Sequence, residues 1–324
     1  MDEFQFIDSI TPFYYRQSSL LKGIGDDTAV IRPPTGFDLV TAVDTMVEDV
    51  HFSLNTMDPY HVGYRALAAN ISDLAAMGSS PAYYMVSLVI PNDWTPKQLE
   101  GIYKGMNELA QVYNMDLIGG DTVSGKQLVL SITVYGFVPY DKSRYRSHAK
   151  ENDIVFVTGT LGDSAYGLYL LQNGENIGVE QNYFVQRHRM PTPRVKFAQK
   201  LQTFKRVCLN DISDGIANEA NEIAAASNID LYLEYEDIPI KRQLKKLPNS
   251  TQREFILSGG EDFELIGTAC KEDWENIKQI ALNTDTEITA IGYTATSQGK
   301  SSVFLSKDNK TSILNKTGYT HLLK

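Results

Sequence analysis

Short acidic segments stand at the ends of apolar stretches, most of them beside glycine. At such a strand end or glycine turn, a carboxylate sits where the backbone can approach a ligand closely. One aspartate of this kind is usually a helix cap or a turn residue. Several together, without a histidine–cysteine cluster, offer the hard oxygen donors that magnesium prefers. The segments are GIGDDTAV (Asp26, Asp27), TAVDTMV (Asp44), ISDLAAMG (Asp73), IGGDTV (Asp121), NDISDG (Asp211, Asp214) and SGGEDFEL (Glu261, Asp262).

Magnesium held by a few carboxylates predicts a phosphate-bearing substrate. A carboxylate and a phosphate oxygen ~5 Å apart repel by roughly 3 kcal/mol at an effective dielectric of about 20, and three such pairs cost on the order of 10 kcal/mol. A polyphosphate therefore needs several divalent ions between itself and the protein. Arg144, Arg146 and Lys150, in the polar segment 139–152, could contact the same polyphosphate, with a solvated linker as the equal alternative.

Other chemically distinctive residues stand alone. His51 lies in VEDVHFS and Tyr319 in TGYTHLL. A structural histidine and a surface-anchoring tyrosine are the commoner roles of isolated residues. The basic run QRHRMPTPR (186–194) predicts a helix entry, with a phosphate contact as the second alternative. Cys208 and Cys270 form no CxxC pair and are predicted to be buried thiols.

One segment imitates a nucleotide-binding motif. Gly120–Lys126 reads GDTVSGK and fits the glycine–lysine part of a P-loop. A P-loop continues with serine or threonine and then a helix, whose first turn cradles phosphate. Here Gln127 follows and 127–138 alternates as a strand, so we reject a P-loop. No GxGxxG opens a helix either, which leaves a Rossmann dinucleotide site unsupported.

Strand and helix patterns alternate through both halves of the chain. Thr95 and Pro96 are typical of a helix start. We predict strands at 30–47 (with a turn at 33–36), 83–90, 116–118, 127–138, 154–158, 263–269 and 287–293, and helices at 59–77, 95–113, 164–172, 194–203 and 214–227. Two turns of the form glycine–glycine–acid are predicted at 119–121 and 259–261.

Length and charge limit the classes of protein. The 324 residues predict two domains, 1–140 and 141–324, of mixed α+β structure. The net charge of −10 argues against nucleic acid as a partner. The first residues, MDEFQFID, do not resemble a signal peptide, and the longest apolar run, near 82–90, is half of what a membrane helix needs. We therefore predict a cytoplasmic protein without a membrane partner.

At this point the chain resembles the thiamine-monophosphate kinase family, in the superfamily of aminoimidazole-ribonucleotide synthetase and selenide, water dikinase. The resemblance extends from Gly23 to Tyr319. It implies two mixed α/β domains, a homodimer whose N-terminal sheets join, and ATP-dependent phosphorylation of thiamine phosphate with several magnesium ions. Its motifs are GIGDDTAV, VDTMVEDVHF, ALAANISDLAAMG, LIGGDT, VTGTLGDSAYGL, RHRMPTPR, DISDG and LSGGEDFEL.

The resemblance also implies roles for single residues. The magnesium ions would be held by Asp27, Asp44, Asp73, Asp121, Asp211 and Asp214, the nucleotide contacted by Gly120, Asp121, Arg146 and Ser213 with Tyr103 near adenine, and thiamine phosphate faced by His51, Glu261 and Tyr319. Ala42 and Val43 stand where the family often has hydroxyl residues, so Val43 could ligate a metal only through its carbonyl. Lys316 stands where the family often has tryptophan.

These observations predict direct transfer of a phosphoryl group. The phosphate of thiamine phosphate is already anionic at neutral pH, so the in-line attack on ATP needs no general base. Catalysis would then rest on positioning and charge neutralisation. Two alternatives stay open: another ATP-dependent ligase or cyclase of the superfamily, and a non-catalytic sensor of nucleotide or metal.

Overall fold

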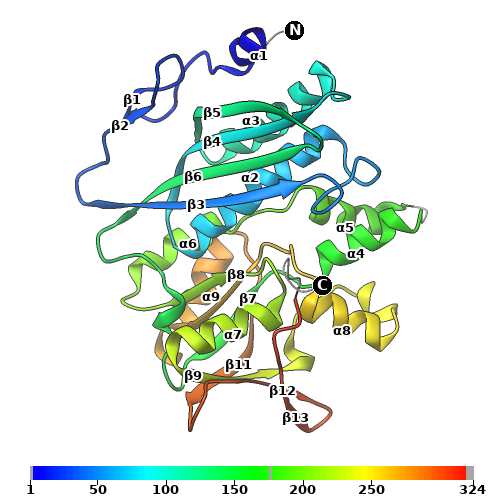
Figure 1. Ribbon diagram of the computed structural model, residues 1–324. Coiled ribbons are helices and arrows are strands. Elements are labelled where there is room, and N and C mark those ends of the chain that lie inside the picture. The colour runs from blue at the N-terminus through cyan, green and yellow to red at the C-terminus, as the bar shows by residue number, and fades with distance from the viewer. Residues whose placement is uncertain (1–2, 175–176, 319–324) are drawn as a thin grey trace. The chain divides into compact units, whose positions relative to one another are not determined.

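The computed structural model describes residues 3–174 and 177–318, and the chain divides into two compact units (Figure 1). The first unit consists of residues 1–74 and 79–141, and the second of residues 75–78 and 142–324. Each unit has helices and one main sheet, so the predicted pair of mixed α/β domains is confirmed as a fold class. No helix within the described ranges combines the length and the apolar character that a membrane span requires.

The first unit is built on a four-stranded sheet of order β3-β6-β4-β5. β4 and β5 run parallel, and the other neighbouring pairs are antiparallel. A separate antiparallel pair, β1-β2, lies before the sheet in the chain. The elements are α1 (Glu3–Ile10), β1 (Leu20–Lys22), β2 (Val30–Ile31), β3 (Phe37–Val47), α2 (Pro59–Ala76), β4 (Ser80–Pro91), α3 (Pro96–Val112), β5 (Asp116–Gly125) and β6 (Val129–Pro139).

Helices α2 and α3 cover one face of this sheet (Figure 1). Alternate residues of β6, such as Leu130, Ile132 and Val134, are fully buried on that side. α3 begins as predicted, because Thr95 and Gln98 form a capping box and Pro96 fills the first turn. The packing is close, since a Cβ on Gly63 of α2 would lie 1.9 Å from the Ile102 carbonyl oxygen of α3.

On the opposite face of the sheet, Leu20 and Ile31 of β1 and β2 pack against Phe137, and the rest of that face is open among the described residues. Leu39 and Val43 of β3 and Val123 of β5 are 47%, 59% and 48% exposed. A polar row crosses the same face, because the β-pairing places Thr45, Ser131, Ser87 and Asp121 side by side across all four strands. Such a partly apolar open face is typical of a surface that a partner covers.

The second unit is built on a seven-stranded sheet of order β13-β12-β9-β11-β7-β10-β8. In this unit the predicted helices and strands correspond to β7, α4, α6, α7, β10 and β11. Strands β8, β9, β12 and β13 and helices α5, α8 and α9 were not predicted from the sequence. The elements are β7 (Ile154–Thr158), α4 (Asp163–Gln172), α5 (Val179–Arg189), α6 (Val195–Lys200), β8 (Cys208–Asp211), α7 (Ile216–Ser227), β9 (Ile229–Glu234), α8 (Asn249–Ser258), β10 (Leu265–Ala269), α9 (Trp274–Asn283), β11 (Ile288–Thr296), β12 (Val303–Lys307) and β13 (Lys310–Ile313), with short 3-10 helices at 146–148, 201–203, 235–237, 244–246 and 271–273.

Several basic residues that could have contacted a ligand instead form hydrogen bonds or ion pairs within the second unit. Arg144 is 1% exposed and donates to the Leu201 and Phe204 carbonyl oxygens, so it is not a linker cation. In the run 186–194, residues 186–189 end α5 and only Arg194 precedes a helix. Arg187 and Arg194 both pair with Glu264, a carboxylate 1% exposed, and they lower its pKa against the effect of burial. A buried ion pair of this kind fixes a fold, and loss of either partner is costly.

Two acids, Asp163 and Asp262, are buried around the start of α4. Asp163 accepts from the Thr160 hydroxyl at 2.5 Å and from the Tyr183 hydroxyl at 2.9 Å. Asp262 accepts from the backbone N–H groups of Gly162 and Ser164. Burial is the main cause that raises the pKa of Asp163 to about 6 and of Asp262 to about 7. Both acids therefore hold a proton more tightly in the folded chain than in the unfolded one.

These raised pKa values predict that the protein loses stability as the pH rises from 5 to 8. The contribution of each acid is complete below its ordinary pKa of about 4 and is lost as the pH passes through about 6 and 7. Thermal melts of Asp163→Asn should show a shallower fall over this range, and the exposed-site control Glu272→Gln should follow the wild type. If the melting temperature of Asp163→Asn falls with pH as steeply as that of the wild type, Asp163 does not have the raised pKa described here.

Candidate active site

Asp27 and Asp121 lie in the wall of one pocket of about 230 Å³ at the β5 edge of the first unit. Both side chains are exposed. Asp26 is a turn residue beside them, since its carboxylate accepts from the Asp27 N–H at 3.0 Å and lies 3.7 Å from the Lys22 ammonium. Among the described residues, the lining contains three aspartates and no lysine or arginine. This is an anionic pocket that favours cations.

Gly120 brings backbone directly into that pocket. The predicted turn at 119–121 is wrong, because these residues continue β5 alongside β4 as far as Gly125. A Cβ at Gly120 would lie 2.0 Å from the Val86 carbonyl oxygen, so no residue with a side chain fits there without a shift. The strand then leads into β6 and not into a helix, which confirms the rejection of a P-loop at 120–126.

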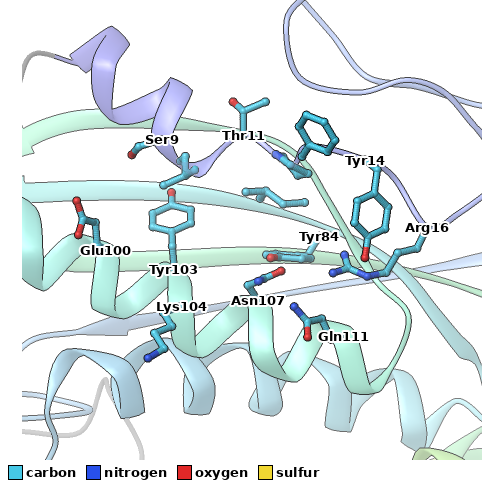
Figure 2. Close-up of a pocket in the computed structure, with 14 residues that line it drawn as sticks. Ser9, Thr11, Tyr14, Arg16, Tyr84, Glu100, Tyr103, Lys104, Asn107 and Gln111 are labelled. Carbon is cyan, nitrogen blue, oxygen red and sulfur yellow. The ribbon is translucent and has the colours of Figure 1, made fainter.

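Tyr103 of α3 connects this pocket to a second one of about 440 Å³. The ring packs edge-to-face on Phe6 at 5.6 Å, and burial raises the pKa of its phenol. Figure 2 shows Tyr103 and Tyr84 in the second pocket, with the Asn107 and Gln111 amides nearby and Arg16 at its end. Aromatic surface with a few amide groups is the lining that suits a flat heterocycle.

The other acids predicted in the first unit lie at the opposite edge of the sheet. Asp44 belongs to a row that continues through Ile132 and Val86 to Gly120. Three strand spacings of about 4.8 Å therefore separate Asp44 from Gly120, roughly 14 Å. The Asp44 N–H donates to the Asn70 side chain at 3.0 Å, and Asp73 lies on α2 one turn beyond Asn70.

The structure thus divides these predicted metal residues into two groups. One group is Asp27 with Asp121, and the other is Asp44 with Asp73; Val43 lies on β3 with its side chain on the open face. Within residues 3–174 and 177–318, no group of three or more His, Cys, Asp or Glu side chains is close enough to hold one metal ion.

His51 is oriented by the end of β3. Its Nδ1 accepts from the Val47 N–H at 3.0 Å, and its own backbone N–H donates to the Val47 carbonyl oxygen at 2.9 Å. Because Nδ1 is an acceptor, the neutral ring carries its proton on Nε2. The imidazole is therefore held in one orientation at the end of β3.

The predicted residues of the second unit meet at one loop. Asp211 ends β8 and is 3% exposed, and Ser213 and Asp214 follow it before α7. α7 begins later than predicted because Gly215, with φ of 104°, belongs to this loop. A Glu261 backbone N–H donates to the Ser213 carbonyl oxygen at 2.6 Å, so a predicted substrate residue lies against a predicted nucleotide residue. Gly260 and Glu261 both have left-handed backbone, with φ of 63° and 58°, in the segment that follows α8.

Arg146 approaches this loop through Asn210. Its Nε donates to the Asn210 Oδ1 at 2.8 Å, and the Asn210 amide donates to Glu219 Oε2 at 2.6 Å. Glu219 was not predicted from the sequence. It is 3% exposed, and burial, followed by the charge of Asp211, raises its pKa to about 8. One feature of the sequence could have identified Glu219: it is an acid on the apolar face of a helix, four residues after Gly215.

The C-terminal segment also lies against the loop. The Gly318 N–H donates to the Asn218 Oδ1 at 3.0 Å, and the Ser258 and Thr317 hydroxyls are 2.6 Å apart. Lys316 pairs with Glu222 of α7. Tyr319, a predicted substrate residue, lies outside the described residues.

Of the two cysteines, Cys208 is buried as predicted, whereas Cys270 is partly exposed where it follows β10.

Comparison with known proteins identifies relatives over both units of the chain. Models of the AIR synthase related protein family match residues 25–138 for the N-terminal domain and 150–305 for the C-terminal domain. The thiamine-monophosphate kinase of Bacillus subtilis (strain 168) is 49% identical over 326 residues, which cover 99% of both chains.

Solved structures give the same result. The thiamine-monophosphate kinase of Stenotrophomonas maltophilia K279a has a TM-score of 0.84 at 33% identity and covers 96% of this chain and 98% of its own. AaThiL complexed with AMPPCP and TMP has a TM-score of 0.78 at 30% identity, with 99% and 97% covered.

The two mixed α/β units are thus those of an AIR synthase related protein, with the N-terminal and the C-terminal domain of that family. Within that class, the similarity to the Bacillus subtilis enzyme extends over nearly all of both chains. The chain belongs to the thiamine-monophosphate kinase family.

Proposed function

We propose that this protein transfers the γ-phosphoryl group of ATP directly to thiamine phosphate and forms thiamine diphosphate. The observation that carries the proposal is the 49% identity to a thiamine-monophosphate kinase over 99% of both chains. A relative covered over 97% of its length is complexed with AMPPCP and TMP, an ATP analogue and a candidate for the acceptor. The acid pocket, the Gly120 backbone and the Arg146 loop supply the matching chemistry in this chain.

The nucleotide position follows from two adjoining pockets. Tyr103, Leu117 and Ile10 line both the anionic pocket and the aromatic pocket of Figure 2. We place the adenine ring on the Tyr103 side and the phosphates toward Gly120 and Asp121. Gly120 lines the anionic pocket, so its backbone is available there to a phosphate.

The charge of the pocket supports magnesium as the cofactor. Asp27 and Asp121 are exposed carboxylates in a lining without basic side chains, and oxygen donors of this kind suit Mg²⁺. We propose Asp27, Asp121, Asp44, Asp73 and, in the second unit, Asp211 and Asp214 as its ligands, with the Val43 carbonyl as a further one. The ions, when bound, neutralise the polyphosphate and the charge that develops during transfer.

The remaining residues orient the acceptor and the nucleotide. Arg146 and Ser213 would contact the ATP phosphates, and His51, Glu261 and Tyr319 would face thiamine phosphate. The acceptor phosphate attacks the γ-phosphorus in line, the new P–O bond forms as the bond to ADP breaks, and no proton has to be removed. Residues 1–140 would be the ATP- and metal-binding domain, and residues 141–324 the C-terminal domain. We place the enzyme in the cytoplasm, where ATP is available.

A homodimer would reunite the two acidic groups. Asp27 with Asp121 and Asp44 with Asp73 lie at opposite sheet edges roughly 14 Å apart. The open sheet face, with Leu39, Val43 and Val123 exposed, is available to a second copy. Joining two such sheets would place the β3 edge of one copy near the β5 edge of the other. Sedimentation of the purified protein should give the mass of two chains, and an active monomer would contradict this arrangement.

The decisive experiment follows ATP turnover with and without thiamine phosphate and identifies every product. ADP and thiamine diphosphate, formed in equal amounts, support the proposal. Release of inorganic phosphate together with a joined or cyclised product would favour a ligase or cyclase of the same superfamily. Binding of ATP without any turnover would favour a sensor.

Lys126 gives a test of the phosphate position. It is exposed in the turn between β5 and β6, so Lys126→Ala should change kcat/KM by less than about threefold. Arg146→Ala should weaken ATP binding about ten- to a hundredfold, because a charge-assisted phosphate contact contributes roughly 1.5–3 kcal/mol. Steady-state kinetics of both variants measure these two expected effects. A steep loss at Lys126 with a mild loss at Arg146 would restore the P-loop hypothesis.

A further inference from the structure

Arg146 is held from two sides by very different partners. On the exposed side, its Nη1 lies 4.0 Å from Glu222, and both side chains are substantially exposed, at 50% and 39%. On the inner side, its Nε donates to the Asn210 Oδ1 at 2.8 Å, and Asn210 is 2% exposed. An exposed ion pair contributes little, whereas a buried hydrogen bond fixes direction. The orientation of the guanidinium is therefore set by Asn210.

The Asn210 amide has its orientation fixed by a second buried contact. Its oxygen accepts from Arg146, while its nitrogen donates to Glu219 Oε2 at 2.6 Å. A flipped amide would present its NH₂ group to the Arg146 Nε–H, so two donors would face each other and that contact would be lost. Asn210 thus transmits the position of Glu219 to Arg146.

Glu219 uses its other oxygen on the loop that carries Ser213 and Asp214. Glu219 Oε1 accepts from the Asp214 N–H at 3.3 Å and from the Ser213 hydroxyl at 3.5 Å. The backbone of Arg146 is held independently, because its carbonyl oxygen accepts from the Ser227 hydroxyl at 2.6 Å. One connected series of hydrogen bonds therefore runs from the Arg146 guanidinium through Asn210 and Glu219 to the loop.

We infer that Asn210 and Glu219 are positioning residues that set the Arg146 guanidinium and the Ser213–Asp214 loop in one fixed geometry for binding the ATP phosphates. The inference rests on the proposed nucleotide contact of Arg146. It adds two buried residues, on β8 and α7, to the determinants of nucleotide affinity. Both act through other side chains and need not touch the nucleotide.

The test is a double-mutant cycle on binding of AMPPCP with Mg²⁺, measured by calorimetry. Asn210→Leu, similar in size, should raise the Kd about three- to tenfold, with kcat at saturating ATP within about threefold of the wild type. In an Arg146→Ala background the same change should alter the Kd by less than about twofold. The control is Glu222→Gln, at the exposed partner of Arg146. Its Kd for AMPPCP should stay within about twofold of the wild-type value.

A second variant keeps the test independent of core folding. Arg146→Lys retains the charge on an exposed side chain but lacks the Nε–H that meets Asn210. Its Kd for AMPPCP should therefore lie within about threefold of the Kd of Arg146→Ala. Glu219→Gln, which offers one acceptor oxygen in place of two, should weaken binding in the same direction as Asn210→Leu.

The outcomes separate this inference from the proposed function. Equal effects of Asn210→Leu with and without Arg146, or full binding by Arg146→Lys, would overturn the positioning role while the kinase assignment stands. An Arg146→Ala variant that binds AMPPCP like the wild type would overturn the proposed phosphate contact and the inference with it. Melting temperatures of all variants identify any loss that is merely structural, which would appear as lower kcat and stability without a selective change in Kd.

Discussion

Asp44→Asn and Asp121→Asn are each expected to lower kcat by at least ~100-fold. Removal of one preoriented charge-stabilising group typically costs a factor of about 100 to 1000 in kcat, and asparagine keeps the shape of aspartate without its charge. The melting temperature should stay the same or rise. Asp121 shares its pocket with Asp26 and Asp27, so loss of one negative charge relieves repulsion in the metal-free protein. Steady-state kinetics and thermal melts measure the two effects.

Asp93→Asn is the matched control for these variants. Asp93 is an exposed aspartate of the same unit, in the segment between β4 and α3. It should keep the activity and the stability of the wild type. If Asp44→Asn and Asp121→Asn instead melt earlier and still turn over, the two aspartates are structural caps and the metal hypothesis fails.

Removal of divalent ions is expected to abolish turnover and leave the fold intact. The proposed ligands Asp27, Asp44 and Asp121 are exposed and do not contribute to a hydrophobic core, so an excess of chelator should leave the circular dichroism spectrum unchanged. Added Mg²⁺ should restore full activity, and Mn²⁺ part of it, because both accept oxygen ligands. Full activity in excess chelator would be incompatible with the proposed role of the carboxylates.

Local chemistry explains what could be predicted from the sequence. Thr95 and Pro96 start α3 because a capping side chain and a fixed φ act within one turn. The DISDG segment forms a loop because Gly215 tolerates a φ of 104°. The meeting of Asp27 with Gly120 and Asp121 in one pocket was implied by the family resemblance, and the structure shows the shared pocket.

Long-range pairing explains what could not be predicted. The placement of β6 between β3 and β4 puts Asp44 and Asp121 at opposite edges, and no local pattern encodes that strand order. Buried polar pairs could not be predicted either, because their partners lie far apart in the sequence. Arg144 contacts carbonyl oxygens about sixty residues away, and Glu264 meets two arginines that local sequence presents as a basic surface run.

The position of Asp44 and Asp121 at opposite sheet edges also bears on genetics. If each site takes Asp121 from one copy and Asp44 from the other, then a mixed dimer of Asp44→Asn and Asp121→Asn chains contains one doubly damaged site and one intact site. Random reassortment makes about half of the dimers mixed, so about a quarter of the wild-type rate should return when two inactive preparations are dissociated and recombined. Two defective alleles expressed in one cell would then complement each other, although neither supports growth without thiamine diphosphate on its own.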